Sequence, residues 1–485
     1  MATEAPATHD VVVIGAGSTG ENVADYAHQG GLSVALVEQA LVGGDCSYWA
    51  CMPSKALLRP PEALAGARAV DGARQAAQGE LEVGAVLRRR DSFAAHWDDG
   101  GQARWVNGIG VELVRGEGRL AGERRVEVSL PAGGTRTLVA RAAVAICTGS
   151  EPALPPVPGL AEARPWTTKE ATSAQAVPRR LAILGGGVAG CEMATAWSAL
   201  GVSEVTVVEQ EATLLPGYEA EAGRRLEEAL EKRGIVVRTA TRVEEVSGGG
   251  GRGPVTLVLA GESGPVELEA DQLLVATGRK ARTTGLGLES VGMEPGSWLE
   301  VDDSCLVEAL PGGWLYAAGD VNHRALLTHM GKYQARICGD AIAARARGED
   351  VSPAPWSPYS ATADHWAIPQ VVFSDPEVGA VGLTEAEARG RGLTVAAVEY
   401  ELGQVAGAAL YADGYSGWAK MVVDTEREVV VGATFVGPGV AEMVHAATVA
   451  VVGEVPLSRL WHAVPAYPTI SEVWLRLLEA WRHRT

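Results

Sequence analysis

Residues 10–38 read DVVVIGAGSTGENVADYAHQGGLSVALVE. An apolar strand pattern leads into the glycine turn GAGSTG, a helix-like segment follows, and a second apolar strand ends at Glu38. Gly15 permits the tight turn, Gly17 lets backbone N–H groups approach a pyrophosphate, and Gly20 allows close helix packing. Glu38 is placed to accept hydrogen bonds from a ribose. The stretch therefore predicts a dinucleotide-binding fold.

The pattern recurs in LAILGGGVAGCEMATAWSALGVSEVTVVEQ, residues 181–210. Here Gly185, Gly187 and Gly190 follow an apolar strand, and the second strand ends at Glu209. Two such folds in one chain imply two bound dinucleotides. The carboxylate of Glu209 would repel a 2′-phosphate, so the fold that takes the nicotinamide is expected to prefer NADH over NADPH.

Length and composition narrow the class of protein. A chain of 485 residues is too long for one ordinary core, so several modules are expected. The formal net charge of −19, from 41 basic and 60 acidic residues, disfavours nucleic acids and anionic membrane surfaces as partners. No apolar run reaches membrane-spanning length. The N-terminal sequence MATEAPATHD has neither the basic start nor the apolar core of a secretory signal, so a cytoplasmic location is expected.

Two of the six cysteines form a local pair. Cys46 and Cys51 lie in GGDCSYWACMPSK, residues 43–55, whereas the other four stand alone in apolar or helical surroundings and are expected to be core residues. A short-spaced pair in a reducing compartment is typically catalytic or metal-binding. A second pair or nearby histidines would be needed for a metal site, and none lies in sequence reach. The pair therefore predicts redox chemistry, and no metal site is expected.

Several motifs in a fixed order resemble the class I flavoprotein disulfide reductases, which include dihydrolipoamide dehydrogenase, glutathione reductase and mercuric reductase. GAGSTG is similar to that family's FAD turn, and GGDCSYWACMPSK is similar to its redox stretch. The resemblance covers nearly the whole chain. The other motifs that carry it are AICTGS at 145–150, VATGRKARTTGLGLE at 275–289, LYAAGDV at 315–321 and IPQVVFSDPEVGAVGLTE at 368–385.

The resemblance implies an α/β fold with two Rossmann-like dinucleotide-binding domains and a C-terminal α+β dimerisation domain. It implies FAD and NADH as cofactors, with NADPH the weaker alternative, and a homodimer whose active site is completed across the interface. The expected segments are the first part of the FAD-binding domain with the cysteine pair (1–155), the NAD(P)H-binding domain (156–280), the second, central part of the FAD-binding domain (281–352) and the dimerisation domain (353–485).

The resemblance also assigns roles to single residues. Cys51 would lie nearest the flavin as a charge-transfer thiolate, and Cys46 would attack the substrate. A thiolate there needs a lowered pKa, from Lys55, a helix N-terminus or an outside base. Lys55 and Glu192 match the family's pair near the flavin N5, where the lysine stabilises reduced, anionic flavin and the glutamate balances its charge. Asp320 would bond the ribitol chain.

Further residues match positions around the cofactors. His329 lies in the helix whose positive end would face the flavin, and it is expected to position that helix and not to act as an acid or base. The remaining positions implied for cofactor binding are Gly44, Thr148, Gly149, Gly278 and Gly319.

Two departures from the family affect the chemistry. In AVPAYPTISEVW the alignment puts Tyr467 where the family has the histidine that serves as acid–base from the partner subunit, and it keeps Glu472, which would orient that residue. Tyrosine side chains, with pKa values near 10, are poor bases at pH 7. Between the cysteines the common Asn and Gly are replaced by SYWA, so Tyr48 and Trp49 either pack locally or narrow access to the sulfurs.

The expected function is that of an FAD-dependent oxidoreductase. Electrons pass from NAD(P)H through FAD to a Cys46–Cys51 disulfide and on to a small disulfide or another thiol-reactive substrate. One alternative is a mercuric reductase-like enzyme, which Tyr467 favours and the lack of cysteines after Cys338 disfavours. Another is a quinone reductase or diaphorase, in which flavin passes electrons directly. A non-enzymatic flavoprotein is the alternative from a different class.

Overall fold

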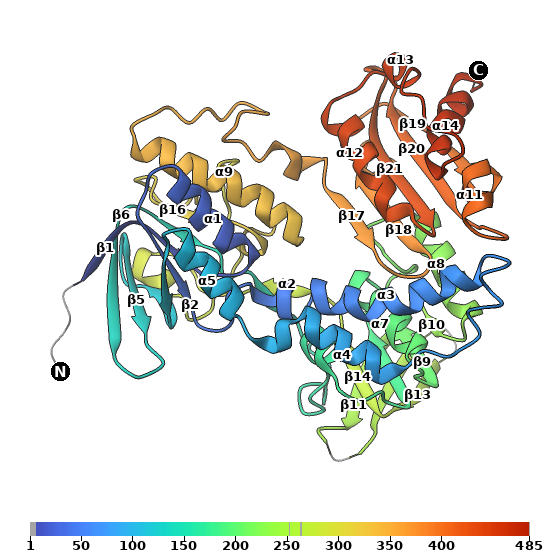
Figure 1. Cartoon of the computed structure of the whole chain (residues 1–485). Coiled ribbons are helices and arrows are strands. Elements are labelled where there is room, and N and C mark those ends of the chain that lie inside the picture. The colour runs from blue at the N-terminus through green and yellow to red at the C-terminus, as the bar shows by residue number, and fades with distance from the viewer. Residues whose placement is uncertain (1–5, 252, 262–263, 485) are drawn as a thin grey trace. The chain divides into compact units, whose positions relative to one another are not determined.

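The computed structural model describes residues 6–251, 253–261 and 264–484 (Figure 1). Residues 1–5 and the last residue of the chain lie outside these ranges. Residues 1–5 belong to the expected first domain and to the N-terminal sequence on which the expected cytoplasmic location rests. The expected division into four segments stays a prediction. The chain forms two compact units: unit 1 is Met1–Pro53, Asp91–Ala153 and Arg279–His365, and unit 2 is Ser54–Arg90, Leu154–Gly278 and Trp366–Thr485.

Unit 1 contains a mixed sheet with the strand order β3-β2-β1-β6-β5-β4, and β16 pairs with β6. The pairs that β1 makes with β2 and β6 are parallel, whereas β5 is antiparallel to β4 and β6. A separate ribbon joins β7 to β15. The strands are β1 (Ala7–Ile14), β2 (Val34–Glu38), β3 (Glu112–Arg115), β4 (Glu117–Leu120), β5 (Arg125–Ser129), β6 (Thr135–Ile146), β7 (Ser150–Pro152), β15 (Arg279–Ala281) and β16 (Leu315–Ala317).

Both faces of the β1–β2–β6 part of this sheet are buried, which explains the uninterrupted apolar run DVVVI. Val11 and Val13 pack toward the helices on one face, and Val12 and Ile14 pack into a second cluster on the other. On the helix face α1 and α9 lie side by side (Figure 1). They approach closely because Gly339 has no side chain: a Cβ there would lie 2.5 Å from the Cβ of Tyr26. The helices of unit 1 are α1 (Ser18–Gln29), α2 (Gly44–Tyr48), α5 (Gly100–Gly108) and α9 (Thr328–Ala346).

Unit 2 holds three sheets. A parallel sheet has the order β10-β9-β8-β14, an antiparallel one the order β11-β12-β13, and the C-terminal module the antiparallel order β17-β18-β21-β20-β19. The strands are β8 (Arg180–Leu184), β9 (Glu204–Val208), β10 (Val236–Arg238), β11 (Arg242–Gly248), β12 (Val255–Gly261), β13 (Gly264–Ala270), β14 (Gln272–Val275), β17 (Pro369–Val372), β18 (Glu377–Gly382), β19 (Val395–Glu401), β20 (Trp418–Asp424) and β21 (Val429–Gly437).

Most helices of unit 2 belong either to the parallel sheet or to the C-terminal module. α7 follows β8 and is buried from Gly190 to Trp197, and α12 and α14 pack on the C-terminal sheet. The helices that lie wholly or mainly in this unit are α3 (Cys51–Arg68), α4 (Val83–Phe93), α6 (Thr168–Ser173), α7 (Val188–Ala199), α8 (Ala220–Lys232), α10 (Glu385–Gly390), α11 (Ala406–Tyr411), α12 (Val444–Val452), α13 (Leu457–Leu460) and α14 (Val473–Arg482).

The expected fold class is confirmed. Each predicted glycine turn connects a parallel strand to a helix, β1 to α1 in unit 1 and β8 to α7 in unit 2, and the C-terminal module combines an antiparallel sheet with helices. Across the described ranges, no helix combines the length and the apolar character that crossing a bilayer requires.

Candidate functional site

The first glycine turn has the geometry that its sequence predicts. Gly15 has φ +98°, and a Cβ there would lie 2.5 Å from the carbonyl oxygen of Cys147. A Cβ on Gly20 would collide with the carbonyl oxygen of Gly15, so only glycine lets α1 pack this closely. Gly17, the N-cap of α1, has open space around it except for Gly44, whose Cα would be 3.9 Å from its Cβ. The turn therefore leaves its backbone accessible at the start of α1.

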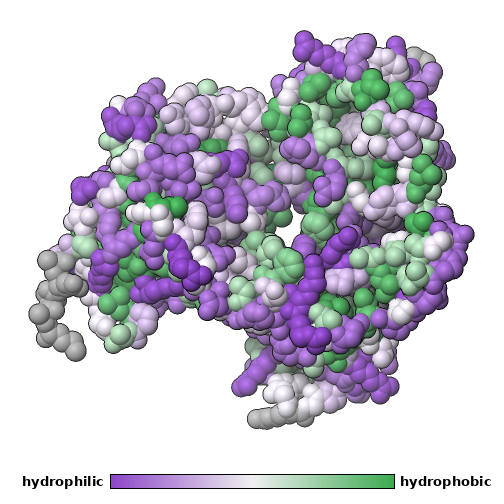
Figure 2. Space-filling model, viewed as in Figure 1, coloured by the Kyte–Doolittle hydropathy of each residue, from purple (hydrophilic) through white to green (hydrophobic). Residues whose placement is uncertain are grey.

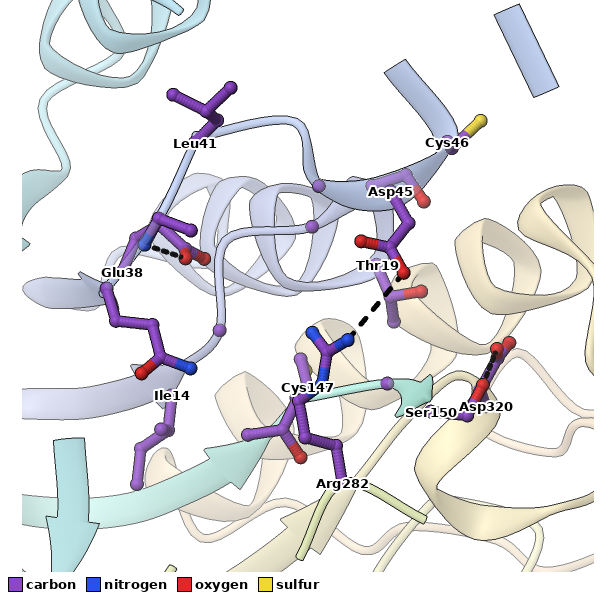
Figure 3. A pocket seen from close by; sticks show the side chains of 18 of the residues that line it. Ile14, Thr19, Glu38, Leu41, Asp45, Cys46, Cys147, Ser150, Arg282 and Asp320 are labelled. Carbon is purple, nitrogen blue, oxygen red and sulfur yellow. Dashed lines mark hydrogen bonds and ion pairs between the residues drawn. The ribbon is translucent and has the colours of Figure 1, made fainter. Parts of the chain in front are cut away.

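A cleft in unit 1 brings this turn together with segments far apart in the sequence (Figure 3). Most of the predicted FAD-binding positions and both cysteines line it. Among described residues, the predicted positions Gly20, Gly278, Gly319 and His329 are not part of its lining. The predicted positions that line it are Gly15, Gly17, Glu38, Gly44, Cys46, Cys51, Thr148, Gly149 and Asp320.

The predicted acids of the cleft are held by hydrogen bonds. Glu38 accepts from the backbone N–H of Ala16 at 2.7 Å and of Ala40 at 2.6 Å, so each carboxylate oxygen keeps a lone pair for another donor. Asp320 accepts a 2.5 Å hydrogen bond from Ser150 Oγ. Both carboxylates are therefore oriented before any ligand binds.

A buried polar atom suits a ligand in this cleft. Thr148 Oγ1 has no hydrogen-bond partner among the described residues, although Thr148 lines the cleft. Buried polar atoms are rarely left unpaired, and such an exception needs an explanation. Together with the accessible N-terminus of α1, it fits the diphosphate and sugar oxygens of FAD. The glycine turn, Glu38, Thr148 and Asp320 are the residues that would hold that cofactor.

The two cysteines of the redox stretch lie on successive helices. Cys46 belongs to α2, and Cys51 begins α3. Cys51 Sγ lies 3.2 Å from Thr328 Oγ1 at the start of α9. The hydrogen bond with Cys51 and burial raise the pKa of Cys46, while Thr328 and the charge of Lys332 act in the opposite direction. The cysteine pair by itself therefore does not lower the pKa of Cys46, although a thiolate at this position needs a lowered pKa.

Tyr48 and Trp49, between the two cysteines, were expected either to pack locally or to narrow access to the sulfurs, and the structure shows where each lies. Tyr48 is buried, its hydroxyl donates to the carbonyl of Val42 at 2.9 Å, and its own carbonyl accepts from Trp97 Nε1 at 3.2 Å. Tyr48 thus packs locally. Trp49 instead lines the cleft, together with Cys46 and Cys51. Neighbouring residues of the gap therefore have different surroundings.

The second glycine turn, in unit 2, repeats the geometry of the first. Gly185 has φ +102° and a Cβ there would lie 2.5 Å from the Ala276 carbonyl oxygen, while a Cβ on Gly187 would meet nothing within 4 Å. A Cβ on Gly190 would collide with the carbonyl oxygen of Gly185. Buried Glu209 accepts from the N–H of Gly186 at 2.6 Å, as Glu38 does from Ala16.

Lys55 and Glu192 form an ion pair within unit 2. Lys55 Nζ lies 2.9 and 2.7 Å from the two carboxylate oxygens of Glu192, which is buried. The Glu192 carboxylate also accepts from the N–H of Phe373 at 3.1 Å, and Lys55 Nζ lies 4.9 Å from the centre of the Phe373 ring. The two residues are thus paired, and their position beside the flavin stays a prediction.

The two C-terminal residues expected to complete the site differ in exposure. Tyr467 is 75% exposed, and neighbouring Val464 is 85% exposed. Glu472 is buried, with one oxygen accepting from Arg476 Nη2 at 2.5 Å. Figure 2 shows apolar side chains at the surface over the module that contains α12, α13 and the C-terminal sheet. The roles of Tyr467 and Glu472 in a partner's site stay predictions.

Sequence reasoning missed a cluster of charged residues in the cleft. Asp45, Arg279 and Arg282 all line it, and Asp45 Oδ2 lies 3.6 Å from Arg279 Nη2 and 3.7 Å from Arg282 Nη2. Arg279 also donates to Ser150 Oγ at 2.5 Å. The only local signal was the basic run GRKAR, which has no spacing that points to Asp45.

Comparison with known proteins agrees with this geometry. The model of the family described as "Pyridine nucleotide-disulphide oxidoreductase" matches residues 9–343, and the model of its dimerisation domain matches residues 368–477. Dihydrolipoyl dehydrogenase 3 of Pseudomonas aeruginosa is 35% identical over 474 residues, covering 96% of each chain. Mercuric reductase of Staphylococcus aureus is 28% identical over 467 residues, covering 96% of this chain and 81% of its own.

A solved structure supports the fold. The HOCl-induced flavoprotein disulfide reductase RclA of Escherichia coli, in its Cu(II) complex, superimposes with a TM-score of 0.81 at 22% identity, covering 97% of this chain and 99% of that one. The chain therefore belongs to the pyridine nucleotide-disulphide oxidoreductase family, and it is an FAD- and pyridine-nucleotide-dependent oxidoreductase with that family's dimerisation domain.

Proposed function

We propose that this enzyme reduces a small disulfide or another thiol-reactive electrophile through Cys46 and Cys51, with electrons from NADH. The observation that carries the proposal is the cleft of unit 1, which both cysteines line together with Asp320 and the first glycine turn. A bound FAD supplies the two-electron carrier between the nicotinamide and the cysteine pair. Dihydrolipoyl dehydrogenases are among its relatives, so a dithiol–disulfide couple is the first substrate class to test.

The cysteines have distinct proposed roles. Cys51, whose sulfur faces the Thr328 hydroxyl, is the sulfur that exchanges electrons with the cofactor. Cys46 attacks the substrate as a thiolate, so its proton must first pass to a base, because its neighbour and its burial favour the neutral thiol. With a disulfide substrate, the attack breaks its S–S bond, releases one half as a thiolate and leaves the other half in a mixed disulfide with Cys46. The Cys51 thiolate then attacks the Cys46 sulfur, releases the second half as a thiolate and closes the Cys46–Cys51 bond. Lys55 balances negative charge at the cofactor while Glu192 holds its ammonium group.

NADH is the proposed reductant. The carboxylate of Glu209 stands at the end of the second strand of the unit 2 fold, where it would repel a 2′-phosphate. The arginines of α8 are already paired: Arg224 with Glu221 and Glu228, and Arg225 with Glu221 and Glu401. Neither of these two arginines is therefore left to reverse the preference.

We further propose a homodimer in which Tyr467 and Glu472 of one subunit complete the site of the other. The high exposure of Tyr467 in the single chain supports this arrangement. The four domain segments set out from the sequence are retained within this proposal. Tyr467 is a weak base compared with the histidine it replaces, so substrates that need little proton transfer are favoured.

The first test is to add one equivalent of NADH to the oxygen-free protein and to record its visible spectrum. The expected result is a long-wavelength charge-transfer band while the flavin absorbance stays largely oxidised, because the electrons rest on the cysteines and Cys51 is a thiolate beside the flavin. Bleached flavin without that band would contradict the proposal, since the cysteine pair would not be accepting electrons.

A second candidate is a quinone reductase, in which the flavin passes electrons directly to the acceptor. The raised pKa of Cys46 favours it, because a neutral thiol is a poor nucleophile. Cys46→Ser separates the two. Disulfide reduction is expected to fall by at least about 1,000-fold, whereas quinone reduction survives. Hg(II) belongs in the same screen, because a mercuric reductase is among the relatives.

A further inference from the structure

Six charged side chains line the cleft of unit 1, and most of them are acidic. Four are carboxylates and two are guanidinium groups. A bound FAD adds the negative charges of its diphosphate, so the cleft needs its cations to offset them. The carboxylates belong to Glu38, Asp45, Glu117 and Asp320, and the guanidinium groups to Arg279 and Arg282.

The guanidinium group of Arg279 is held by hydrogen bonds and an ion pair within the chain. Its guanidinium donates to Ser150 Oγ at 2.5 Å and to the Ser150 carbonyl at 2.8 Å, and it lies 3.7 Å from Asp320. These bonds tie β15 to β7, the strand with which it pairs. Arg279 thus has little freedom to turn toward a ligand.

Arg282 is held much more loosely. Its backbone N–H donates to the Gly149 carbonyl at 3.2 Å, which fixes the residue at the wall of the cleft. Its guanidinium has only two ion pairs in the described part of the chain, at 3.7 Å to Asp45 and 4.0 Å to Glu151, and the side chain is 39% exposed. Neither distance is that of a hydrogen bond, so its N–H donors remain available. Figure 3 shows the side chain reaching across the cleft to Asp45.

Asp45 brings that guanidinium beside the glycine turn. It follows Gly44, whose backbone touches the turn so closely that a Cβ on Gly44 would lie 2.7 Å from the Cα of Gly17. Gly17 also forms an isolated bridge with Gly43. The turn precedes α1, whose N-terminus has no side-chain cap and favours a negative ligand. Arg282 is therefore tethered next to the place where a diphosphate is favoured.

We propose that Arg282 is an additional FAD-binding residue, held by Asp45 so that it closes the cleft over the cofactor's diphosphate. This inference rests on the FAD-binding part of the proposed function. In this arrangement Asp45 orients the guanidinium, and Arg282 offsets both the diphosphate and the carboxylate of Asp45. Bidentate guanidinium–phosphate contacts of this kind are strong and directional.

The test measures FAD release from the full-length holoenzyme, followed by the rise in free flavin fluorescence on dilution. Arg282→Gln is expected to raise the Kd for FAD about tenfold at low ionic strength, and less at 1 M salt. Lys280→Gln is the matched control, because Lys280 is the neighbouring cation, pairs with Glu151 at 3.0 Å and does not line the cleft. It should change the Kd less than about twofold.

Two further variants test the role of charge. Asp45→Asn added to Arg282→Gln should recover at least about threefold in affinity, because it removes a carboxylate left without its cation. Arg282→Lys keeps the charge and should bind FAD within roughly threefold of the parent protein, which also guards against a misfolded glutamine variant. Equal Kd values for Arg282→Gln and Lys280→Gln would overturn the inference. A parent protein that holds no flavin would instead overturn the proposed function itself.

Discussion

The thiol of Cys46 is held in two opposing ways. Its hydrogen bond with Cys51 and its burial raise its pKa, whereas Thr328 and the charge of Lys332 lower it. The increase prevails, so the thiol is neutral at pH 7 and needs a base before it can attack a substrate. The resemblance of the sequence to disulfide reductases implies that Tyr467 of the partner subunit stands where that base is expected, and this role stays a prediction. The substrate range therefore depends on how much proton transfer each acceptor demands.

Glu21, in the first turn of α1, carries a pH-dependent share of the stability. Burial raises its pKa from 4.5 to about 7, although Lys332 acts against the increase, and one carboxylate oxygen has no partner in the described chain. The folded state therefore holds the proton more tightly than the unfolded state. The contribution of Glu21 to the free energy of unfolding is complete below pH 4.5. As the pH rises through about 7 this contribution is lost, and the free energy of unfolding falls by about 2–3 kcal/mol.

Glu21→Gln is expected to remove that loss. The free energy of unfolding of the variant, relative to the parent, should increase between pH 5 and pH 7 and stay level above it, because glutamine does not ionise. Urea unfolding at a series of pH values measures the difference. Asp25→Asn, one turn further along the same helix, is the control. A difference that is the same at pH 5 and pH 8.5 would show that Glu21 ionises equally easily in both states.

A short left-handed turn contacts the last residue of α2, the helix that contains Cys46. Ala95, His96 and Trp97 form this 3₁₀ element, and all three have positive φ, of 48°, 53° and 58°. Such angles cost free energy in residues other than glycine and persist only where the surroundings impose them. Here Trp97 Nε1 donates to the carbonyl of Tyr48, one of the four residues between the two cysteines.

Two variants with opposite expected effects test this element. Trp97→Phe keeps an aromatic ring but removes the donor to Tyr48, and should lower the free energy of unfolding by about 1 kcal/mol. Ala95→Gly relieves the left-handed strain and should raise the free energy of unfolding by about 0.5 kcal/mol. Thermal unfolding of the holoenzyme compares them. If both variants were destabilised equally, the turn would not be strained.

At the scale of the molecule, the exposed apolar residues of the C-terminal module predict its assembly. Val464 is 85% exposed beside Tyr467, in the dimerisation domain. Exposed apolar side chains that gather on one module mark interaction surfaces. In a symmetric dimer a charge placed there would be buried twice.

Val464→Asp is therefore expected to give a monomer by size-exclusion chromatography with light scattering. FAD should stay bound, because the cleft belongs to unit 1, whereas disulfide reduction should fall roughly tenfold or more as the partner's residues are lost. Val236→Asp is the matched control, since Val236 is an exposed valine, 47% accessible, on β10 outside that domain. A Val464→Asp protein that remained dimeric and active would exclude this face as the interface.

Much of the fold and part of the site follow from local sequence. The turns at Gly15 and Gly185, the strands before them and the acids Glu38 and Glu209 were predicted because glycine angles and apolar runs act over a few residues. The pairing of Lys55 with Glu192 was predicted from family motifs, which carry long-range information in the order of the chain. The roles of these residues toward the cofactors await experiment.

The features of the site that depend on residues distant in the sequence became visible only in the folded structure. The sequence indicated an α/β fold with two glycine turns and a cysteine pair, because glycine angles and apolar runs are local properties, and its resemblance to a known family implied the flavin. It did not reveal that Arg282 meets Asp45 across more than two hundred positions, that Tyr48 faces the interior while Trp49 faces the cleft, or that Cys46 is a weak acid. Charge, burial and hydrogen bonding at a site are sums over neighbours in space, and only the folded chain brings those neighbours together.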